Sequence, residues 1–443
     1  MPFICYVFFT NLAESVKHIM LIEFNVKNFR SFWETQTLNL VASSLSELQE
    51  NNTIRPKTNS LPRLLRSAVV YGPNGAGKSN LITALHFMKE FILSSSKESQ
   101  EGETIKRKSF LLHSNGPNES SVMEVIFIEG DVRYQYGFAV TNQRVVQEWL
   151  LAYPENRAQR WFERSYNPDT KQEQWLFGSK FTGPKKLWKE ATRSNALFLS
   201  TAVQLNNDQL KPIYSWFQKL AIIRHGQLIN PEFTIRTCQD KESCQRILDF
   251  MNGADLSIDG IDVTEKKITQ EQLKLPSDMP IDLQKIIKKD IIDTTFYKVE
   301  FVHQNREIGF TVSLPLEEES DGTQKLFAYA APWLDVLDNG LVLVVDELDN
   351  SLHPHIVRFL LQLIQNSTTN KKGGQLIFST HDTSILDQNI LRRDQIWFIE
   401  KDSMQASQLY PLSDFHPRKG EALEKGYLQG RFGALPYIGE VNF

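Results

Sequence analysis

The chain contains little cysteine, and none of it follows a pattern typical of disulfide scaffolds or zinc sites. Its 443 residues include three cysteines, Cys5, Cys238 and Cys244, and no two of them form a CxxC pair. An odd, small number of cysteines argues against a disulfide-rich or zinc-ribbon protein and favours a reducing compartment. We therefore expect a cytoplasmic localisation.

Long hydrophobic runs are also missing. No apolar stretch approaches the ~18 residues of a membrane span, so we expect no membrane partner. Residues 2–9 are apolar, but they lack the basic flank and the small-residue cleavage site of a signal peptide. We interpret residues 1–19 as a loose N-terminal extension.

Neither sign of charge is in marked excess. Lysine and arginine together number 49 and aspartate and glutamate 53, which gives a formal net charge of −4. The overall charge therefore gives no support to nucleic acid binding, although a local basic patch remains open. The length allows two or three domains at roughly 100–200 residues each.

What the sequence does contain is a phosphate-binding motif from Gly72 to Ser79, which reads GPNGAGKS. Two glycines separated by four residues and followed by Lys-Ser have the spacing of a P-loop. Residues 67–71 are apolar and β-branched, which predicts a buried strand before the motif. The apolar spacing over residues 80–88 predicts a helix after it.

Strand, loop and helix together supply the chemistry of an anion site. Glycines let successive backbone N–H groups turn towards an anion, and the helix N-terminus adds free N–H groups and the positive end of its dipole. A lysine here reaches the outer phosphates of ATP, and a serine hydroxyl binds Mg²⁺. The alternative is a glycine-rich turn that binds nothing. We predict a nucleotide site made by Gly72, Asn74, Gly75, Ala76, Gly77, Lys78, Ser79 and Asn80, with Ser79 also a metal ligand.

An acidic pair, Asp346 and Glu347, follows a second predicted buried strand at 340–345. Such a pair at the carboxyl end of a buried strand is costly unless it handles a cation or a proton. We assign Asp346 to Mg²⁺ and Glu347 as the general base that activates water. A third buried run, 375–379, leads to His381, which we expect beside the phosphate-binding strand and close to the γ-phosphate.

The hydrophobic patterns predict a mixed architecture. Apolar residues alternate with polar ones over 21–40, 121–153 and 296–314, which predicts antiparallel strands, whereas residues 208–289 have a helical pattern. Buried strands that alternate with helices predict a parallel sheet covered on both faces. We therefore expect an α/β P-loop NTPase fold, with a mixed sheet flanked by helices, an antiparallel β layer and an inserted helical lobe.

Four segments follow from these patterns. We predict the extension at 1–19, a first ATPase lobe with the P-loop and the β layer at 20–205, the helical lobe at 206–295, and a second ATPase lobe with the C-terminal tail at 296–443.

Together the motifs resemble those of ABC-type ATPases, in their SMC/RecF-like branch. The run Ser320-Asp321-Gly322-Thr323-Gln324 matches the family's Ser-x-Gly-x-Gln signature, which caps the γ-phosphate held by a second subunit. Taken alone, this run is an acidic loop with Ser320 as an N-cap. The resemblance implies ATP and Mg²⁺ as cofactors, nucleotide contacts by Ser320, Gly322, Gln324, Asp349 and Arg30, a switch histidine at His381, and a metal-binding Q-loop glutamine at Gln204.

A closer resemblance is to the short OLD-like ATPases that accompany separate Toprim-type nucleases in bacterial anti-phage systems such as PARIS. It rests on the same motifs and on the tail at 415–434. It implies a nucleotide-dependent sensor and switch that forms a homodimer, or a higher homo-oligomer, around ATP. It also implies a separate nuclease effector and a phage protein or DNA as the trigger.

Two other functions stay open. A RecF-like ATPase for DNA repair or DNA clamping would need a basic track along the DNA backbone. The candidates for such a track are Lys106, Arg107, Lys108, Lys185, Lys186, Lys189 and Arg193. A scaffold with a vestigial site would require the loss of a key group, and all of them are present in the sequence.

Overall fold

The computed structural model describes residues 19–56, 61–98, 100–225, 230–267, 280 and 295–437. The chain divides into two compact units. The first comprises Met1–Gln227, Asp335–Asn350 and Val357–Phe443, and the second comprises Leu228–Leu334 and Ser351–Ile356. The extension predicted at 1–19 lies outside the described residues, apart from Ile19, where β1 begins.

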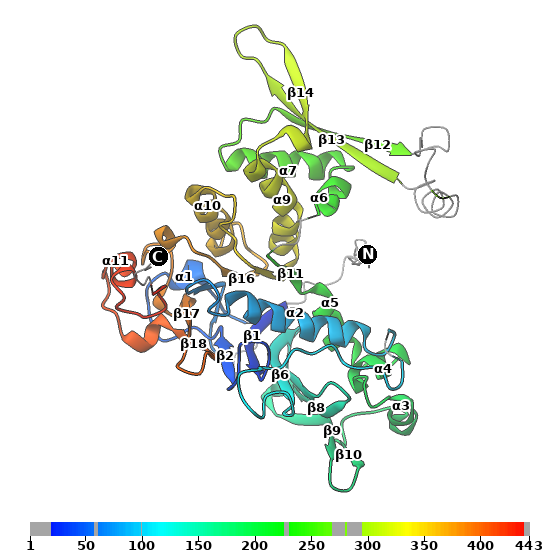
Figure 1. Ribbon diagram of the computed structural model, residues 1–443. Coiled ribbons are helices and arrows are strands. Elements are labelled where there is room, and N and C mark those ends of the chain that lie inside the picture. The colour runs from blue at the N-terminus through cyan, green and yellow to red at the C-terminus, as the bar shows by residue number, and fades with distance from the viewer. Residues whose placement is uncertain are drawn as a thin grey trace. The chain divides into compact units, whose positions relative to one another are not determined.

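An antiparallel sheet of seven strands forms one layer of the first unit (Figure 1). The order across it is β10-β9-β8-β7-β6-β1-β2. Gly130 takes a left-handed φ of 66° in the turn between β6 and β7. The strands are β1 (Ile19–Lys27), β2 (Gln36–Asn39), β6 (Ser121–Glu129), β7 (Val132–Val140), β8 (Val145–Tyr153), β9 (Gln159–Asn167) and β10 (Gln172–Phe177).

A second sheet of six strands in the same unit has the order β11-β15-β16-β5-β17-β18. All neighbours run parallel except β17 and β18. Every residue of β5, β15 and β16 is buried, as expected for strands covered on both faces. The strands are β5 (Ser67–Tyr71), β11 (Ala221–Ile223), β15 (Val342–Val345), β16 (Gln375–Ser379), β17 (Ile396–Lys401) and β18 (Ser407–Pro411).

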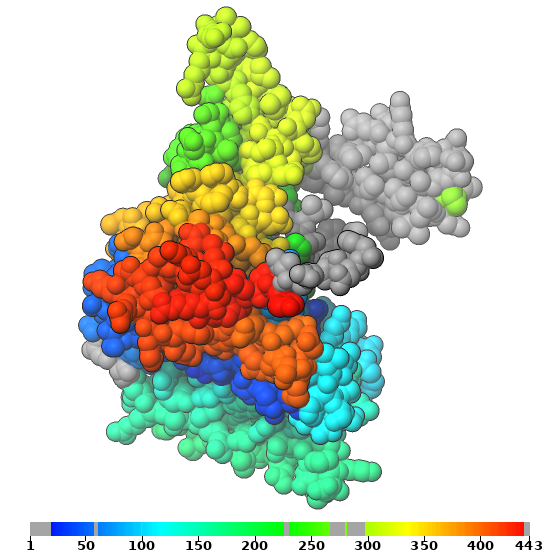
Figure 2. Space-filling view, turned by 60° about the vertical axis from the view of Figure 1, so that its left-hand side comes forward, coloured from blue at the N-terminus to red at the C-terminus, as the bar shows by residue number. Residues whose placement is uncertain are grey.

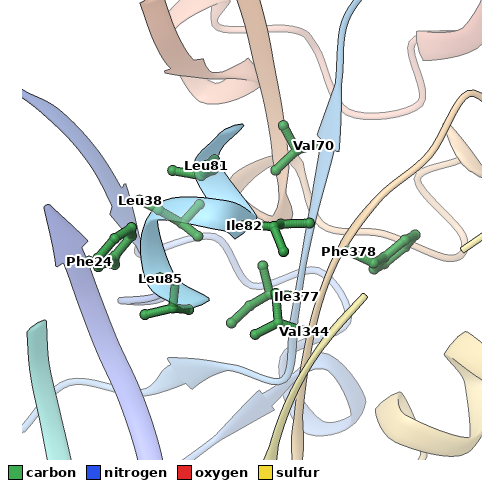
Figure 3. Close-up of a pocket in the computed structure, with 9 residues that line it drawn as sticks. All are labelled: Phe24, Leu38, Val70, Leu81, Ile82, Leu85, Val344, Ile377 and Phe378. Carbon is green, nitrogen blue, oxygen red and sulfur yellow. The ribbon is translucent and has the colours of Figure 1, made fainter. Parts of the chain in front are cut away.

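Helix α2 (Lys78–Ser94) packs between these two sheets (Figure 3). Three of its apolar residues line one small pocket together with residues of both sheets. They are Leu81, Ile82 and Leu85 on the helix, Phe24 and Leu38 on β1 and β2, and Val70, Val344, Ile377 and Phe378 on β5, β15 and β16. Because burial of apolar surface is the dominant favourable term in folding, the helix that follows the P-loop is held by both layers.

The remaining helices and strands of the first unit are short. None of the helices in the described part of the chain is long and apolar enough to cross a membrane. The elements are α1 (Gln49–Asn52), β3 (Thr53–Ile54), β4 (Leu64–Leu65), α3 (Lys185–Ala191), α4 (Phe198–Gln204), α5 (Lys211–Lys219), α11 (Leu423–Leu428) and, from Val357 onwards, α10 (Pro354–Gln365).

The second unit combines helices with a three-stranded antiparallel sheet in the order β12-β13-β14. Phe301 of β13 packs edge-on against Phe327 of α9, with 5.3 Å between ring centroids. The elements are α6 (Glu232–Thr237), α7 (Lys241–Gly253), β12 (Gly260–Lys267), β13 (Thr295–Gln304), β14 (Thr311–Pro315) and the part of α9 (Asp321–Asn339) up to Leu334.

The predicted α/β fold is confirmed: the first unit has a mixed sheet, helices and an antiparallel β layer. The segment boundaries differ from the prediction. The described residues of 206–295 do not form one helical lobe, because α5 and β11 belong to the first unit and β12 is a strand. The second unit also continues past 295, since β13 pairs with β12 along its length.

Candidate functional site

The predicted P-loop connects β5 to α2 at the carboxyl edge of the parallel strands. Gly72, Gly75 and Gly77 have φ values of 156°, 76° and 123°, which L side chains rarely adopt. Gly77 is the N-cap of α2, so the free N–H groups of the first helical turn follow it directly. The local geometry is therefore that of an anion-binding loop.

Two serines distant in the sequence support the back of this loop. Ser407 Oγ donates to the Ala76 carbonyl at 2.5 Å and contacts Ser31 Oγ at 2.7 Å. A Cβ built on Gly77 would lie 2.3 Å from Ser407 Oγ, so Gly77 is required by space as well as by φ. Figure 2 shows orange C-terminal residues beside blue N-terminal residues. In the same region of the sequence as these serines, Gln36 Nε2 donates to Gln408 Oε1 at 3.1 Å.

Lys78 points back onto its own loop. Its Nζ donates to the carbonyls of Gly72 at 2.7 Å and Pro73 at 3.3 Å, and the residue is only 6% exposed. Burial lowers the pKa of Lys78, and the nearby carboxylates of Glu347, Asp346 and Asp349 act against that shift. The structure therefore brings the predicted lysine and the predicted acidic pair into one electrostatic environment.

Arg30 lies against the first turn of α2. Its Nη1 donates to Asn80 Oδ1 at 3.2 Å, while Asn80 Nδ2 donates to Ser31 Oγ at 2.8 Å. Burial, and then the neighbouring charge of Arg224, lower the pKa of Arg30. Arg30 Nε is buried, and it has no hydrogen-bond partner among the described residues. Arg30 and Arg224 are two neighbouring positive charges, and Arg30 keeps an unused N–H donor. This arrangement suits a polyanionic ligand.

Ser379 fixes the acidic pair. Its Oγ donates to Asp346 Oδ1 at 2.6 Å and accepts the backbone N–H of Glu347 at 2.8 Å. Asp346 is 5% exposed, whereas Glu347 is partly exposed and has a left-handed φ of 52°. The two carboxylates therefore have different environments, one buried and hydrogen-bonded and one reaching towards solvent.

His381 and Asp349 lie together beyond β16, which is the neighbour of β5. The His381 backbone N–H donates to Asp349 Oδ2 at 3.2 Å, and the imidazole is on an exposed residue. Predicted residues from three separate parts of the sequence thus meet at one edge of the sheet.

Sequence reasoning missed His225. It follows β11, which pairs with β15 so that Ile223 lies opposite Val345. His225 Nδ1 is 2.6 Å from Glu347 Oε2, which makes it a direct partner of the predicted base. The only sequence signal was a short apolar triplet, Ala221–Ile223, followed by Arg224 and His225.

Gln204, in contrast, is not at the phosphate loop. It is the last residue of α4 and not part of a polar loop. Glu148 of β8 accepts the backbone N–H groups of Phe198 and Leu199 at 2.7 and 3.0 Å, and Ser200 donates to Ile92 near the C-terminal end of α2. The P-loop is at the other end of α2, so the assignment of Gln204 as a Q-loop and metal ligand is wrong.

The signature residues lie in the second unit, at the start of α9. Ser320 Oγ accepts the backbone N–H of Thr323 at 3.1 Å, so it caps the helix as predicted. Gln324 Nε2 donates to the Glu319 carbonyl at 2.8 Å, and Glu319 Oε1 lies 2.7 Å from His303 Nε2. A Cβ on Gly322 would lie 3.0 Å from the Ser351 carbonyl. The loop is therefore well ordered by its own contacts.

Most of the basic residues considered for a DNA track are engaged within the chain. Arg107 is 5% exposed, and its guanidinium donates to Asn142 and to the Glu119 and Pro117 carbonyls, so it cannot contact DNA phosphates. Four more of these basic residues have contacts within the chain. Lys185 lies over the rings of Phe177 and Phe181, and Lys189 lies over the ring of Trp175. Lys186 forms an ion pair with Glu190, and Arg193 donates to the Ser96 carbonyl.

The site fits a nucleotide with Mg²⁺. Among the described residues no group of three or more His, Cys, Asp or Glu side chains could hold a metal alone. Mg²⁺ is usually bound by one or two carboxylates together with substrate phosphates, for which Asp346 and the Ser79 hydroxyl are suitable donors. The N–H groups of the loop and Lys78 are suitable donors for phosphate oxygens.

Comparison with known proteins gives one family. A model described as "AAA domain, putative AbiEii toxin, Type IV TA system" matches residues 67–387, from β5 to beyond His381. No curated protein matches the chain.

Two of the solved structures that are similar to this chain each align with 88% of it. One is described as the SmcHead bound to the C-winged helix domain of ScpA, with 11% identity, 97% of its chain covered and a TM-score of 0.39. The other is the SMC head domain from Thermotoga maritima, with 12% identity, 98% of its chain covered and a TM-score of 0.38.

Proposed function

The chain belongs to the AAA-domain family whose model matches residues 67–387, and from this premise we propose that it is an ATP-binding and ATP-hydrolysing switch subunit that works as a homodimer. The observation that carries the proposal is the meeting of Lys78, Asp346 and Glu347 at the carboxyl edge of one parallel sheet. A buried cation near three carboxylates, at a helix N-terminus, suits a polyphosphate with a divalent cation.

Each residue then has a defined task. Lys78 exchanges the carbonyls of Gly72 and Pro73 for the outer phosphates, and Arg30 offers its unused N–H group. Asp346, oriented by Ser379, and Ser79 hold Mg²⁺, which neutralises phosphate charge when bound. Glu347 accepts a proton from the attacking water, because its carboxylate is the partly exposed member of the acidic pair.

The dimer follows from the signature loop. In ABC-type ATPases, which the motifs resemble, this loop completes the γ-phosphate site of a second subunit. Ser320, Gly322 and Gln324 are ordered by contacts within their own unit, so they form a rigid surface that a partner's nucleotide can meet. ATP binding is then coupled to dimer closure.

A mixing experiment tests this dimer. Lys78→Ala removes the phosphate contact of one chain, and Ser320→Asp keeps an N-cap while it places a negative charge against the γ-phosphate. Each variant alone should be inactive. A 1:1 mixture should recover about a quarter of wild-type turnover, because half of the dimers are mixed and each has one intact site. A mixture as inactive as its components would contradict the shared site, and the Lys78→Ala protein alone is the control.

We further propose that the switch controls a separately encoded Toprim-type nuclease in anti-phage defence, with a phage protein or DNA as the trigger. Two things support this: the resemblance to short OLD-like ATPases, and a family description that places the AAA domain in a two-component toxin–antitoxin system. The neighbouring gene is the check. We expect it to encode such a nuclease that co-purifies with this chain, and an operon without any nuclease gene would contradict the proposal.

A further inference from the structure

The contact between His225 and Glu347 arises from the sheet topology. β11 and β15 are parallel neighbours, and the Asp346 backbone N–H donates to the Ile223 carbonyl at 2.8 Å just beyond the paired strands. His225 and Glu347 are each two residues past the end of their own strand. Equivalent positions on adjacent parallel strands bring their side chains together, and the two reach 2.6 Å.

We propose that His225 is a positioning residue for the general base, and this inference rests on the ATPase function proposed above. The Nδ1–H group of His225 donates to Glu347 Oε2, since a carboxylate can only accept. That hydrogen bond fixes Oε2 and, with it, the orientation of the carboxylate that takes the proton from water. His225 acts through Glu347 and is assigned no role of its own in the proton transfer.

Ser379 holds the backbone of Glu347, whereas His225 contacts its carboxylate. The backbone N–H bonds to Ser379 Oγ and φ is 52°, but the side chain is long and a quarter exposed. An exposed glutamate samples many rotamers, and fixing it before reaction removes an entropic cost from the chemical step. The carboxylates of Asp346 and Asp349 lie nearby, so a neutral or cationic donor is a better partner than another acid.

The choice of Nδ1 makes a sharp test possible. The amide nitrogen of asparagine can take the place of Nδ1, whereas that of glutamine reaches the place of Nε2, and leucine has similar size without a donor. The imidazole is half exposed, so none of the three changes leaves a large cavity. The matched variants are therefore His225→Asn, His225→Gln and His225→Leu.

We expect His225→Leu and His225→Gln to lower kcat about 10- to 100-fold with KM and ATP affinity nearly unchanged, and His225→Asn to keep most of the wild-type kcat. In the double variant His225→Leu/Glu347→Gln, the loss should not exceed that of Glu347→Gln alone, because both changes remove one function. Steady-state kinetics and a nucleotide-binding assay give all of these values.

Three results would overturn the inference: a wild-type kcat in His225→Leu, equal losses in the asparagine and glutamine variants, or fully additive losses in the double variant. If His225→Leu does not fold, the comparison of asparagine with glutamine decides alone. The two proposals can fail separately. If the wild type hydrolyses ATP, Glu347→Gln is inactive and His225→Leu is unaffected, the role of His225 is refuted and the ATPase proposal stands. A wild-type protein without hydrolysis would refute both.

Discussion

Replacing Lys78 with alanine is expected to abolish ATP binding. The change removes the buried ammonium group that interacts with the carboxylates of Asp346, Glu347 and Asp349, so a triphosphate would meet three negative groups without this positive charge. Hydrogen bonds to charged groups contribute about 1.5–3 kcal/mol each, which predicts an affinity loss of about 10- to 100-fold per phosphate contact. Calorimetric titration with ATP and Mg²⁺ measures this directly.

The Lys78→Ala variant should also change the stability of the nucleotide-free protein, by much less than it changes ATP affinity. Lys78 Nζ also satisfies the carbonyls of Gly72 and Pro73, so its loss should destabilise the nucleotide-free protein by about 1 kcal/mol. Lys180→Ala is the matched control, because that lysine is exposed and far from the loop in sequence. If the Lys78→Ala protein binds ATP as tightly as the control variant does, the proposed phosphate contact of Lys78 is refuted.

Replacing Glu347 with glutamine should stop turnover while ATP stays bound. An amide cannot take a proton from water, and loss of a general base typically costs about 10²- to 10⁴-fold in rate. The variant keeps Lys78, Asp346 and the P-loop, so nucleotide binding remains and the closed dimer should accumulate. Single-turnover kinetics together with light scattering in the presence of ATP report both effects.

Glu101→Gln is the control for this change, since it removes an exposed carboxylate from the same unit. It should leave both turnover and the monomer–dimer equilibrium as in the wild type. Unchanged turnover in Glu347→Gln would assign the base elsewhere, and an inactive variant that stays monomeric with ATP would contradict closure around the nucleotide.

The parts of the site that the sequence predicted are those encoded locally. The P-loop is one contiguous motif with a strand before it and a helix after it, so Gly72–Ser79 needed no tertiary information. Asp346 and His381 each follow a buried apolar run, and the carboxyl ends of parallel strands meet at one edge. The structure places both runs in the sheet of β5: β16 pairs with β5, and β15 pairs with β16.

The parts that were missed depend on which segments become neighbours. β11 has three residues, too few for a periodicity, so His225 could not be paired with Glu347 before the strand order was known. Gln204 was misplaced because α4 is fixed by Glu148, which lies 50 positions before Phe198 in the sequence. Arg107 was considered a surface charge, but Asn142 and two carbonyls hold its guanidinium inside the fold.

The position of Ser407 has a consequence for biosynthesis. The ribosome delivers Gly72–Ser79 early, whereas the hydroxyl that backs Ala76 and Gly77, and the strands that flank β5, come from residues near the end of the chain. A nascent chain therefore lacks the support that shapes its phosphate loop until Ser407 has been synthesised. The complete loop can form only after more than 300 further residues have left the ribosome.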